Sequence, residues 1–497
     1  MAMGRVLHYG QDAFYLDLGL EEAPDRAART HAAAAWLRAR LPEADVVVGG
    51  GVVVVANVPR SADVEATLAA AAEVSAEQAP SGRLHVIRAI YDGPDLESVA
   101  SALGLGVEEV IARHTGREVV VELVGFLPGF GYLGPIDPAL VMPRRPSPRP
   151  SVPAGSIGIA GAFTGIYPFS SPGGWNLIAR GMGLSLFDPA REPAILFAPG
   201  DRVRFEQIAA DEAPGPAPAP ALPAEEPPRG LVVLSVQPGT TVQDAGRRGW
   251  LARGIPPSGP LDPEAHAAAN EAVGNAPSAA AIEVPLGSLA VRARGELLVS
   301  VDGDAPVRLA DGEEWKVAPG PQAVRYVAVR GGIDVPAVLG SRATLLVARM
   351  GGLGGRALRA KDVLPVGAEA ERESKAAQRR EGAENALVVD PGPHVDRFPE
   401  GALEAFLAST FRVSRLGDRV GVRLEGTKIP RDRPDLALPV PMLRGAVQVS
   451  TDGTPIVFGP DHPTTGGYPV LAVVRRDAWG ALARRRPGDE VRFVRGA

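Results

Sequence analysis

Residues 125–180 have the sequence GFLPGFGYLGPIDPALVMPRRPSPRPSVPAGSIGIAGAFTGIYPFSSPGGWNLIAR. Glycine and proline recur so often here that no helix of ordinary length fits, and short strands joined by tight turns remain. The glycines either make the corners of a loop-rich β-barrel or let backbone approach a ligand at a barrel mouth. The pattern leaves both interpretations open. Polar side chains able to do chemistry lie between the turns: Arg144, Arg145, Thr164, Tyr167, Ser171, Trp175 and Asn176.

Composition limits the class of protein. A length of 497 residues predicts several domains, and an apolar fraction of 45% is enough for real cores. The 59 glycines and 49 prolines favour a turn-rich β architecture. A net charge of −6 speaks against a nucleic-acid partner. Because there is no cysteine, disulfides, thiolate nucleophiles and cysteine-ligated zinc are excluded.

The chain shows no signal of membrane insertion. Its first residues lack the apolar core of a signal peptide. The longest apolar run, residues 46–58, is broken by glycines and is too short to span a bilayer. We expect a soluble cytoplasmic protein with no membrane partner.

The first 210 residues predict two domains. Residues 1–90 favour a small α+β domain, and residues 91–210 favour a β-barrel. The elements expected in the first domain are strand 14–18, helix 25–41, a hairpin over 45–55, helix 64–79 and strand 85–90. A single helix over 96–110, capped by Asp95, leads into strand 118–124. The isolated His8, His31 and His85 are expected to be surface or packing residues.

Residues 211–230 contain seven prolines among twenty residues and predict an extended linker. The second module then divides into β-barrel halves over 231–386 and 387–497. Asp262 is expected to cap a helix over 263–273, and residues 330–346 are expected to form two strands around a glycine turn. Residues 367–386 predict a charged connection. The sequence PGD-VRF closes both modules, which indicates that two related barrels end in the same hairpin.

Motifs of several enzyme classes are missing. The sequence has no GxxxxGK[ST] phosphate loop, no HExxH and no GxSxG at a strand-to-helix turn. Residues 352–357 fit GxGxxA, but no βαβ unit surrounds them, so an ordinary loop is the better interpretation. The remaining polar side chains suit a small polar or anionic ligand. For His114 and His462 the alternative is a satisfied structural histidine, and for Gln243, Asp244, Arg247, Thr464, Thr465 and Tyr468 it is an ordinary turn.

Several segments of the sequence resemble a known family. GFLPGFGYLG, PRRPSPRPSVPAGSIGIAG and TGIYPFSSPGGWNLI closely resemble the B subunit of bacterial 5-oxoprolinase, also called the kinase-inhibitor or allophanate-hydrolase-subunit-1 type. TTVQDAGRRGW, RGGIDVPAVLGSR, GAVQVSTDGTPI and TTGGYP resemble the C subunit, of the allophanate-hydrolase-subunit-2 type. Both are similar to the carboxyltransferase part of urea carboxylase. The resemblance implies a B–C fusion made of a small α+β domain and cyclophilin-like β-barrels.

The implied activity is ATP-dependent hydrolysis of 5-oxo-L-proline to L-glutamate, with ATP and Mg²⁺ and a separate A-type subunit. A homo-oligomer is compatible with this. The resemblance implies catalytic roles for Asp244, Arg247, Asp262, Arg342 and Tyr468. Among these we expect the two arginines to contact anions, one of the two aspartates to serve as base or metal ligand, and Tyr468 to position substrate. It implies substrate or nucleotide binding for Thr164, Tyr167, Ser171, Trp175, Gln243, Ser258, Arg330, Asp334, Arg423, Gln448 and Thr465.

One position departs from the family pattern. The family has arginine where this chain has His462, before TTGGYP, and a histidine is a weaker phosphate or carboxylate ligand than an always-charged arginine. Two alternatives to the lactam hydrolase stay open. One is a biotin-dependent carboxyltransferase acting on a urea-like amide, although the chain has no biotin attachment site. The other is an inhibitor of a sensor histidine kinase. A neighbouring gene for an A-type subunit favours the hydrolase, and one for a biotin carboxylase favours the transferase.

Overall fold

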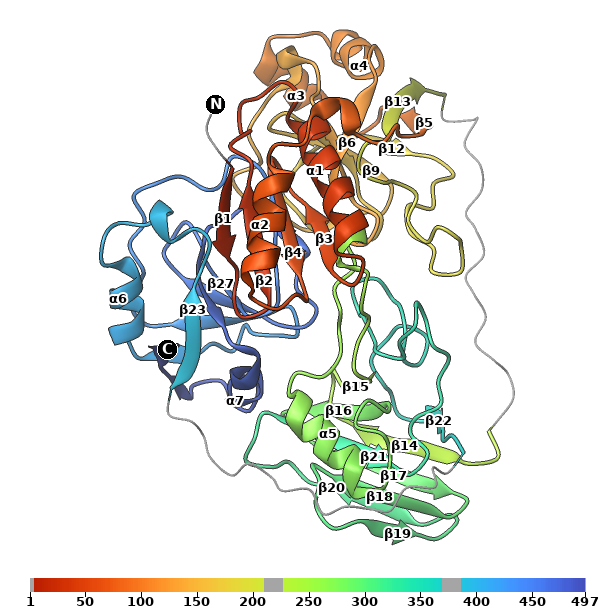
Figure 1. The fold of residues 1–497 in the computed structure, drawn as a ribbon. Coiled ribbons are helices and arrows are strands. Elements are labelled where there is room, and N and C mark those ends of the chain that lie inside the picture. Colours follow the sequence, from red (N-terminus) through yellow and green to blue (C-terminus); the bar gives the residue numbers. More distant parts are fainter. Residues whose placement is uncertain (1–3, 210–226, 369–385, 497) are drawn as a thin grey trace.

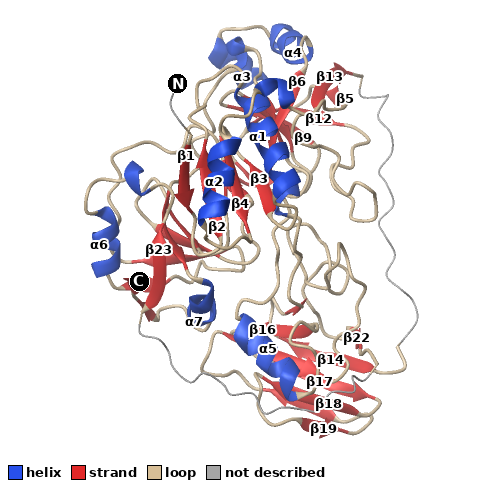
Figure 2. Ribbon diagram, viewed as in Figure 1, coloured by secondary structure: helices blue, strands red, loops and turns tan. Residues whose placement is uncertain are grey.

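The computed structural model of the chain describes residues 4–209, 227–368 and 386–496. The chain forms four parts, which we call the N-terminal domain (4–79), the first barrel (80–209), the sandwich (227–368) and the second barrel (386–496) (Figure 1). Strands outnumber helices throughout, which confirms the mainly β fold with α+β character (Figure 2). The predicted linker and charged connection lie largely outside the described residues.

The N-terminal domain is a four-stranded antiparallel sheet with two helices on one face (Figure 1). Its strand order is β1-β2-β4-β3. The elements are β1 (Arg5–His8), β2 (Ala13–Asp17), α1 (Arg26–Arg40), β3 (Asp45–Val48), β4 (Val52–Ala56) and α2 (Ala62–Ala71). The hairpin predicted over 45–55 is confirmed, with its turn at three glycines. The second helix ends at Ala71, earlier than predicted.

Both faces of this sheet are buried. Phe14 and Leu16 pack into a core shared with the helices, whereas Ala13 and Tyr15 pack into a core shared with the second barrel. Side chains alternate between the two faces of a strand, so a strand covered on both faces needs apolar residues at every position. This explains the continuous valine run of β4, and it fixes the N-terminal domain against the second barrel.

The first barrel is closed, in the order β10-β7-β6-β13-β5-β12-β9. Strand β5 belongs to it by pairing, so the N-terminal domain ends before residue 84 and not at residue 90 as predicted. The elements are β5 (Leu84–Ile90), α3 (Leu96–Leu103), α4 (Val107–Thr115), β6 (Val119–Val124), β7 (Gly131–Gly134), β8 (Arg149–Val152), β9 (Ser156–Ala160), β10 (Phe163–Ile166), β11 (Ser171–Gly173), β12 (Asn176–Gly181) and β13 (Arg202–Gln207).

The single helix predicted over 96–110 is two helices. Gly104 ends the first of them with φ +68, a left-handed conformation that glycine adopts without strain. The predicted cap by Asp95 is also wrong. Its carboxylate makes no capping bond and instead accepts hydrogen bonds from Arg145 at 2.9 Å and Arg149 at 2.7 Å. These charge-assisted bonds tie the 125–180 stretch to the helix.

The sandwich consists of two facing sheets around one core, rather than the barrel half predicted over 231–386. The sheets have the orders β20-β17-β14-β22 and β15-β16-β21-β18-β19. The elements are β14 (Gly230–Val236), β15 (Thr241–Gln243), α5 (Pro263–Ala272), β16 (Ala281–Pro285), β17 (Leu289–Arg294), β18 (Leu297–Val301), β19 (Val307–Leu309), β20 (Glu314–Val317), β21 (Val324–Val329) and β22 (Val363–Pro365).

Residues 330–346 do not form the two strands predicted for them. They make only isolated bridges and run out of the sandwich toward the first barrel. Leu345, Ala348 and Met350 join the core of the first barrel, so contacts between domains decide this conformation. The GxGxxA segment at 352–357 is a series of turns, which supports the ordinary-loop interpretation.

The second barrel repeats the first. Its strands run β31-β24-β25-β28-β27-β30-β23-β32, and β31 and β32 are consecutive in the chain, so the ring closes. The elements are β23 (Leu387–Pro391), α6 (Ala402–Ala408), β24 (Phe411–Val413), β25 (Gly421–Glu425), β26 (Val440–Pro441), β27 (Ala446–Val449), β28 (Pro455–Phe458), β29 (Thr465–Gly466), β30 (Val470–Val474), α7 (Trp479–Ala483), β31 (Glu490–Val491) and β32 (Phe493–Arg495).

The shared PGD-VRF sequence has the same structure in both barrels. Asp201 accepts a bond from the backbone N–H of Ala198 at 2.9 Å, and Asp489 accepts one from Arg486 at 2.8 Å. The strand that follows pairs in parallel with the first strand of its own barrel in each case. The internal repeat is therefore confirmed, although the motif is a turn leading into an inserted strand and not a hairpin.

Candidate functional site

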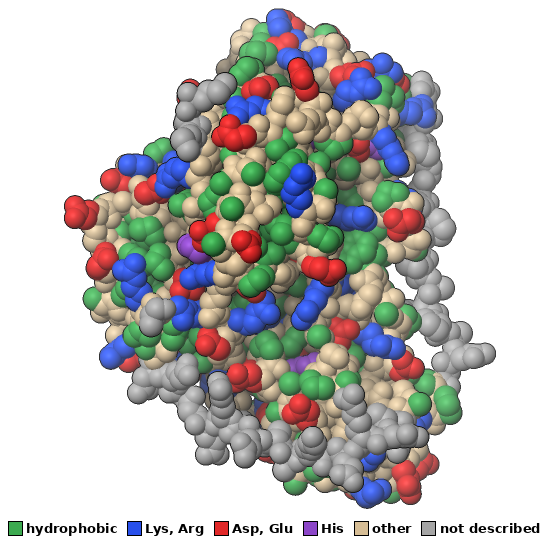
Figure 3. Space-filling view, viewed as in Figure 1, with side chains coloured by type: hydrophobic (Ala, Val, Ile, Leu, Met, Phe, Trp, Pro, Cys, Tyr) green, Lys and Arg blue, Asp and Glu red, His purple; other side chains and the backbone are tan. Residues whose placement is uncertain are grey.

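A cleft of about 400 Å³ opens where the N-terminal domain, the 245–258 segment of the sandwich and the second barrel meet. Five arginines and two aspartates line it, so its wall is rich in positive charge. On the face drawn in Figure 3, blue Lys and Arg side chains gather across the middle of the molecule, with acidic side chains among them. Sequence segments from both predicted modules are needed to build this cleft.

Arg247 is held rigidly at the cleft. Its backbone N–H donates to Pro257 at 2.7 Å, its Nε donates to the carbonyl of Val338 at 3.2 Å, and its Nη2 donates to the carbonyl of Ala343. Gly351 packs so close that a Cβ there would lie 2.5 Å from Nη2. Burial lowers the pKa of Arg247 to about 10, although Asp244 and Asp461 oppose this, so the group stays charged at neutral pH.

Ser258 lies beside Arg247 in the same cleft. Its backbone has φ +55, a left-handed conformation that a serine adopts only when its surroundings hold it there. Its N–H donates to the carbonyl of Pro460 at 3.1 Å, which ties the sandwich to the second barrel. Its side-chain oxygen is buried and has no hydrogen-bond partner.

His462 and Arg444 come from the second barrel. Burial lowers the pKa of His462 to about 4, so the ring is neutral at pH 7. Its Nδ1 lies 3.0 Å from the carbonyl oxygen of Pro463. Arg444 donates to the carbonyl of Leu261 at 2.7 Å, and its guanidinium lies 4.0 Å from the ring centroid of Trp479.

The N-terminal domain contributes a carboxylate that the sequence did not identify. Asp45, at the start of β3, lines the cleft and is 5% exposed. Burial raises the pKa of this carboxyl, and the hydrogen bond from Asn57 Nδ2 at 2.8 Å only partly offsets that effect. A carboxylate with a raised pKa in a cleft is suited to general base chemistry. Nothing in the local pattern of a buried valine strand signals that role.

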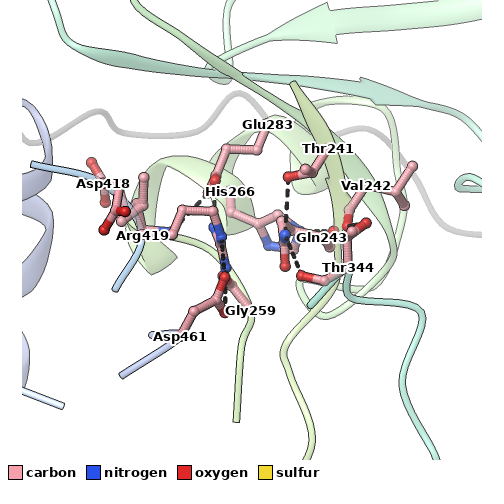
Figure 4. Close-up of polar contacts among 12 residues, drawn as sticks. Thr241, Val242, Gln243, Gly259, His266, Glu283, Thr344, Asp418, Arg419 and Asp461 are labelled. Carbon is pink, nitrogen blue, oxygen red and sulfur yellow. Dashed lines mark hydrogen bonds and ion pairs between the residues drawn. The ribbon is translucent and has the colours of Figure 1, made fainter. Parts of the chain in front are cut away.

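A network of buried charge joins the second barrel to the sandwich (Figure 4). Arg419 of the second barrel bonds to Asp461 at 2.8 Å and to Glu283 of the sandwich. Glu283 also accepts a bond from the Tyr326 hydroxyl at 2.7 Å. Arg419 donates a further bond to the carbonyl of Gly259 at 2.7 Å, one residue after Ser258. The sequence did not predict this network, because its members are far apart in the chain. The one local signal near Arg419 is the Gly417-Asp418 turn that precedes it.

Asp244 holds two loops together. Its Oδ1 accepts bonds from the Ser341 hydroxyl at 2.6 Å and from the N–H of Gly246 at 2.9 Å, and its Oδ2 accepts one from the N–H of Arg342 at 2.5 Å. Asp244 is not among the residues that line the cleft. Its position therefore favours a supporting role, in which it fixes the segments on either side of Arg247.

Asp262 is placed away from the cleft as well. It caps α5, accepting from the N–H of Ala265 at 3.1 Å, which confirms the predicted cap. Its other oxygen pairs with Arg484 at 2.6 Å, and the residue is 0% exposed. Both oxygens are engaged inside the protein, which favours a structural role for Asp262 over the predicted role of base or metal ligand.

Gln243 is buried beside the network in Figure 4. Its Nε2 donates to the Thr241 hydroxyl at 3.0 Å and to the carbonyl of Thr344 at 3.2 Å. Arg342 pairs with Asp334 at 2.6 Å on the surface, and does not line the cleft. Two further predicted residues are also outside the cleft lining, namely Arg330 and the exposed Arg423.

Three predicted residues of the second barrel lie together. Gln448 donates to the carbonyl of Tyr468 at 2.9 Å. Thr465, on β29, reaches the first barrel, because a Cβ on Gly125 would lie 2.5 Å from its hydroxyl oxygen. The group thus marks the contact of the second barrel with the start of the 125–180 stretch, outside the cleft lining.

The four residues predicted in the first barrel are also outside the cleft lining. Thr164 is buried and lies 2.9 Å from His114, which is thereby a satisfied structural histidine as the alternative interpretation expected. Tyr167 and Trp175 pack edge-on against Phe130, at centroid distances of 5.4 and 5.3 Å. The fourth, Ser171, lies on β11. Of the sixteen predicted site residues, only Arg247 and Ser258 line the cleft.

Two kinds of feature are absent from the described residues. Among the described residues, no three His, Cys, Asp or Glu side chains come together in a group that could hold a metal ion. In the parts of the chain that the structure describes, every helix is too short or too polar to cross a bilayer.

Comparison with known proteins identifies both halves. The family described as "Carboxyltransferase domain, subdomain C and D" matches residues 4–197, and "Carboxyltransferase domain, subdomain A and B" matches residues 253–495. The first of these regions covers the N-terminal domain and the first barrel, and the second covers most of the sandwich and the second barrel. The predicted Pro-rich linker, residues 211–230, lies in the interval between the two matched regions.

Curated relatives give the same division. The B subunit of 5-oxoprolinase from Escherichia coli O157:H7 is 50% identical over 129 residues, which is 25% of this chain and 59% of that protein. The chain thus matches about three fifths of that relative's length. The C subunit of 5-oxoprolinase from Escherichia coli strain K12 is 36% identical over 275 residues, which is 51% of this chain and 87% of that protein. A urea amidolyase of Lachancea kluyveri is 32% identical over 51% of this chain and 16% of its own length.

A solved structure matches nearly the whole chain. The crystal structure of TTHA0988 has a TM-score of 0.83 and 35% identity, covering 97% of this chain and 99% of that chain. The arrangement of the four parts is therefore shared with that protein. This chain belongs to the carboxyltransferase-domain family, with an N-terminal half like the B subunit of 5-oxoprolinase and a C-terminal half like the C subunit of that enzyme.

Proposed function

We propose that the chain is the B–C part of an ATP-dependent 5-oxoprolinase, which hydrolyses 5-oxo-L-proline to L-glutamate together with a separate A-type subunit. The observation that carries the proposal is that halves similar to the B and C subunits are joined in one chain and line one cleft together. Joining them keeps their effective concentration high, which suits two parts of one enzyme.

The chemistry requires three kinds of group. The substrate is an unreactive five-membered lactam. ATP can activate it by transferring its terminal phosphoryl group to the lactam oxygen, after which water attacks the carbon, the C–N bond breaks, and ADP, phosphate and glutamate leave. Such a route needs positive charge for anions, donors for a developing oxyanion and a base for the water.

The cleft offers a candidate for each group. Arg247 supplies a buried positive charge, Ser258 supplies an unpartnered hydroxyl, and Asp45 supplies a carboxylate whose pKa burial raises. His462 is neutral at pH 7 and donates through Nδ1 to the Pro463 carbonyl, so its Nε2 can accept a hydrogen bond. ATP and Mg²⁺ enter the proposal through the family resemblance, and we assign no residue of the chain to the metal.

The test is a coupled assay of ADP release and glutamate formation with 5-oxo-L-proline, ATP and magnesium. The full chain is assayed with and without an A-type subunit encoded in the same genome. Glutamate formed only in the presence of that subunit is the expected result. No turnover by a folded, stable complex of the two would overturn the proposal.

One alternative has support of its own. Both matching family models are described as carboxyltransferase domains, and half of the chain is similar to urea amidolyases. In that case the substrate is a urea-like amide, and the carboxyl group comes from a biotin carrier on another protein. Transfer of labelled carboxylate from carboxybiotin to urea by the purified chain would favour this activity over lactam hydrolysis.

A further inference from the structure

Two residues that line the cleft each carry an unpartnered donor, and they lie on neighbouring segments. Nη1 of Arg247 and the hydroxyl of Ser258 are buried without a hydrogen-bond partner, and the two residues are 2% and 3% exposed. The bond from the Arg247 N–H to the carbonyl of Pro257 places the segments side by side. A buried donor without a partner is costly, so native proteins rarely leave one, and two in one cleft indicate a bound group that satisfies both.

The backbone supports the same conclusion. Ser258 is held at φ +55 between two fixed points, its own N–H on Pro460 and the Gly259 carbonyl on Arg419. Strain of this kind persists only where the surroundings over-determine it, and it concentrates at ligand sites. Ser258 is thus held at the cleft wall by a frame that the sandwich and the second barrel build together.

We propose that Arg247 and Ser258 form a carboxylate subsite, which binds the carboxylate of a small lactam acid and distinguishes it from a neutral amide. The inference rests on the proposed function, in which that acid is 5-oxo-L-proline. One donor from each residue matches the two oxygens of a carboxylate, and the guanidinium supplies the opposite charge.

Three of the other four arginines that line the cleft are already engaged. Arg475 pairs with Asp390 at 2.8 Å, and Arg476 pairs with Asp12. Arg444 donates to a backbone carbonyl and stacks on a tryptophan ring. The fourth, Arg248, is exposed. One unpartnered guanidinium nitrogen and one hydroxyl suit the two oxygens of a singly charged carboxylate better than a phosphate with three oxygens and a larger charge.

Calorimetric titration of the full chain, without an A-type subunit, tests the subsite directly. Three probes are used: 5-oxo-L-proline, 2-pyrrolidinone, which is the same lactam without its carboxylate, and inorganic phosphate. We expect 5-oxo-L-proline to bind at least roughly tenfold more tightly than either of the others, because a charge-assisted bond supplies that much discrimination.

Ser258→Ala is the decisive variant, because the hydroxyl has no partner inside the protein and its loss leaves the fold intact. Its melting temperature should stay unchanged, while the Kd for 5-oxo-L-proline rises about tenfold or more and binding of 2-pyrrolidinone does not change. Arg247→Lys keeps a charge but loses the guanidinium fork. It should weaken the binding of 5-oxo-L-proline and leave the binding of 2-pyrrolidinone unchanged. Ser98→Ala, on the surface helix α3, is the control.

Several outcomes overturn the subsite: wild-type affinity in Ser258→Ala, equal affinity for 2-pyrrolidinone, tighter binding of phosphate, or no binding of 5-oxo-L-proline at millimolar concentration. The outcome is separable from that of the proposed function. Selective carboxylate binding without glutamate formation keeps the subsite and removes the hydrolase. If the complex forms glutamate and Ser258→Ala leaves that activity unchanged, the hydrolase is kept and the subsite is removed.

Discussion

Arg419 of the second barrel is ion-paired with Glu283 of the sandwich, 136 residues earlier in the chain. The guanidinium also binds Asp461, so it is paired with two carboxylates that are 2% and 6% exposed. Its third contact, to Gly259, follows directly on Ser258. This one side chain therefore connects the position of the cleft wall to the packing of two domains.

Replacing Arg419 with methionine should destabilise the protein strongly. The change leaves Glu283 and Asp461 buried without their partner, and breaking a buried ion pair in this way costs about 3–5 kcal/mol. Denaturant unfolding measures the loss. Arg292→Met is the matched control, because its pair with Glu314 is half-exposed and such pairs contribute about 0–1 kcal/mol. Equal effects of the two changes would contradict the prediction.

The buried His114 should make stability depend on pH. Its Nδ1 lies 2.6 Å from the Tyr91 hydroxyl and its Nε2 lies 2.9 Å from Thr164, and burial lowers its pKa to about 3. The unfolded chain, with a histidine pKa near 6.5, takes up the proton first as pH falls. The free energy of unfolding should therefore fall by about 1.4 kcal/mol for each unit by which the pH is lowered between roughly pH 6 and pH 3.

Denaturant unfolding of wild type and His114→Gln at neutral pH and near pH 4.5 checks this. The variant should be less stable at neutral pH but lose less stability on acidification, because it has no proton to take up. His8→Gln is the control, since His8 is exposed beside Glu65. If the wild-type and His114→Gln slopes coincide, the low pKa of His114 is wrong.

Local sequence determined the elements that were predicted correctly. The hairpin of β3 and β4 depends on a valine run and a glycine turn within a dozen residues, and the cap of α5 depends on Asp262 and the proline after it. Both signals act between neighbours in the chain. The equivalent turns of the two barrels were also predicted from a local signal, because the PGD-VRF sequence contains the glycine and aspartate that make the turn.

The failures have a common cause in long-range contacts. Asp95 has the residue type of a cap, but the arginines that take its carboxylate are 50 and 54 residues away. Residues 330–346 have the pattern of strands, but the first barrel supplies their core. The cleft joins Asp45, Arg247 and His462 from three separate segments. The family resemblance identified Arg247, and the departure from the family pattern drew attention to His462. No signal in the sequence indicated Asp45.

Asp45→Asn should reduce the proposed lactam hydrolysis without removing substrate binding. The substitution keeps the size of the side chain and the possibility of a bond to Asn57, but it removes the base, and a general base contributes about 10²–10⁴-fold to rate. The assay is glutamate formation in the presence of the A-type subunit, with calorimetric binding of 5-oxo-L-proline alongside.

The pH profile supplies a second measurement. Because burial raises the pKa of Asp45, wild-type activity should fall on acidification at a pH above the ordinary range of an aspartate, and the residual activity of the variant should lack that limb. Asp92→Asn is the control, since Asp92 pairs with Arg180 on the surface. Undiminished kcat in Asp45→Asn would exclude Asp45 as the base.

The two halves should associate even when they are not covalently joined. A shared core unites Tyr9 and Tyr15 of the N-terminal domain with Val440 and Met442 of the second barrel. Two fragments encoded separately, with the break between residues 210 and 226, should therefore copurify after coexpression. The interface is apolar and needs no linker to form.

Gly50→Ala tests this interface at one point. The N–H of Gly50 donates to the carbonyl of Pro439 at 2.8 Å, and a Cβ on Gly50 would lie 2.4 Å from Cβ of Leu438. Overpacking of this kind costs about 1–3 kcal/mol, so the affinity between the fragments should fall by roughly tenfold or more. The matched control is Gly106→Ala, which adds the same methyl group where no atom lies within 4 Å. Wild-type fragments that separate during purification would show that the linker and not the shared core holds the halves together. Equal affinities for the two variants would show that the contact at Gly50 does not contribute to the interface.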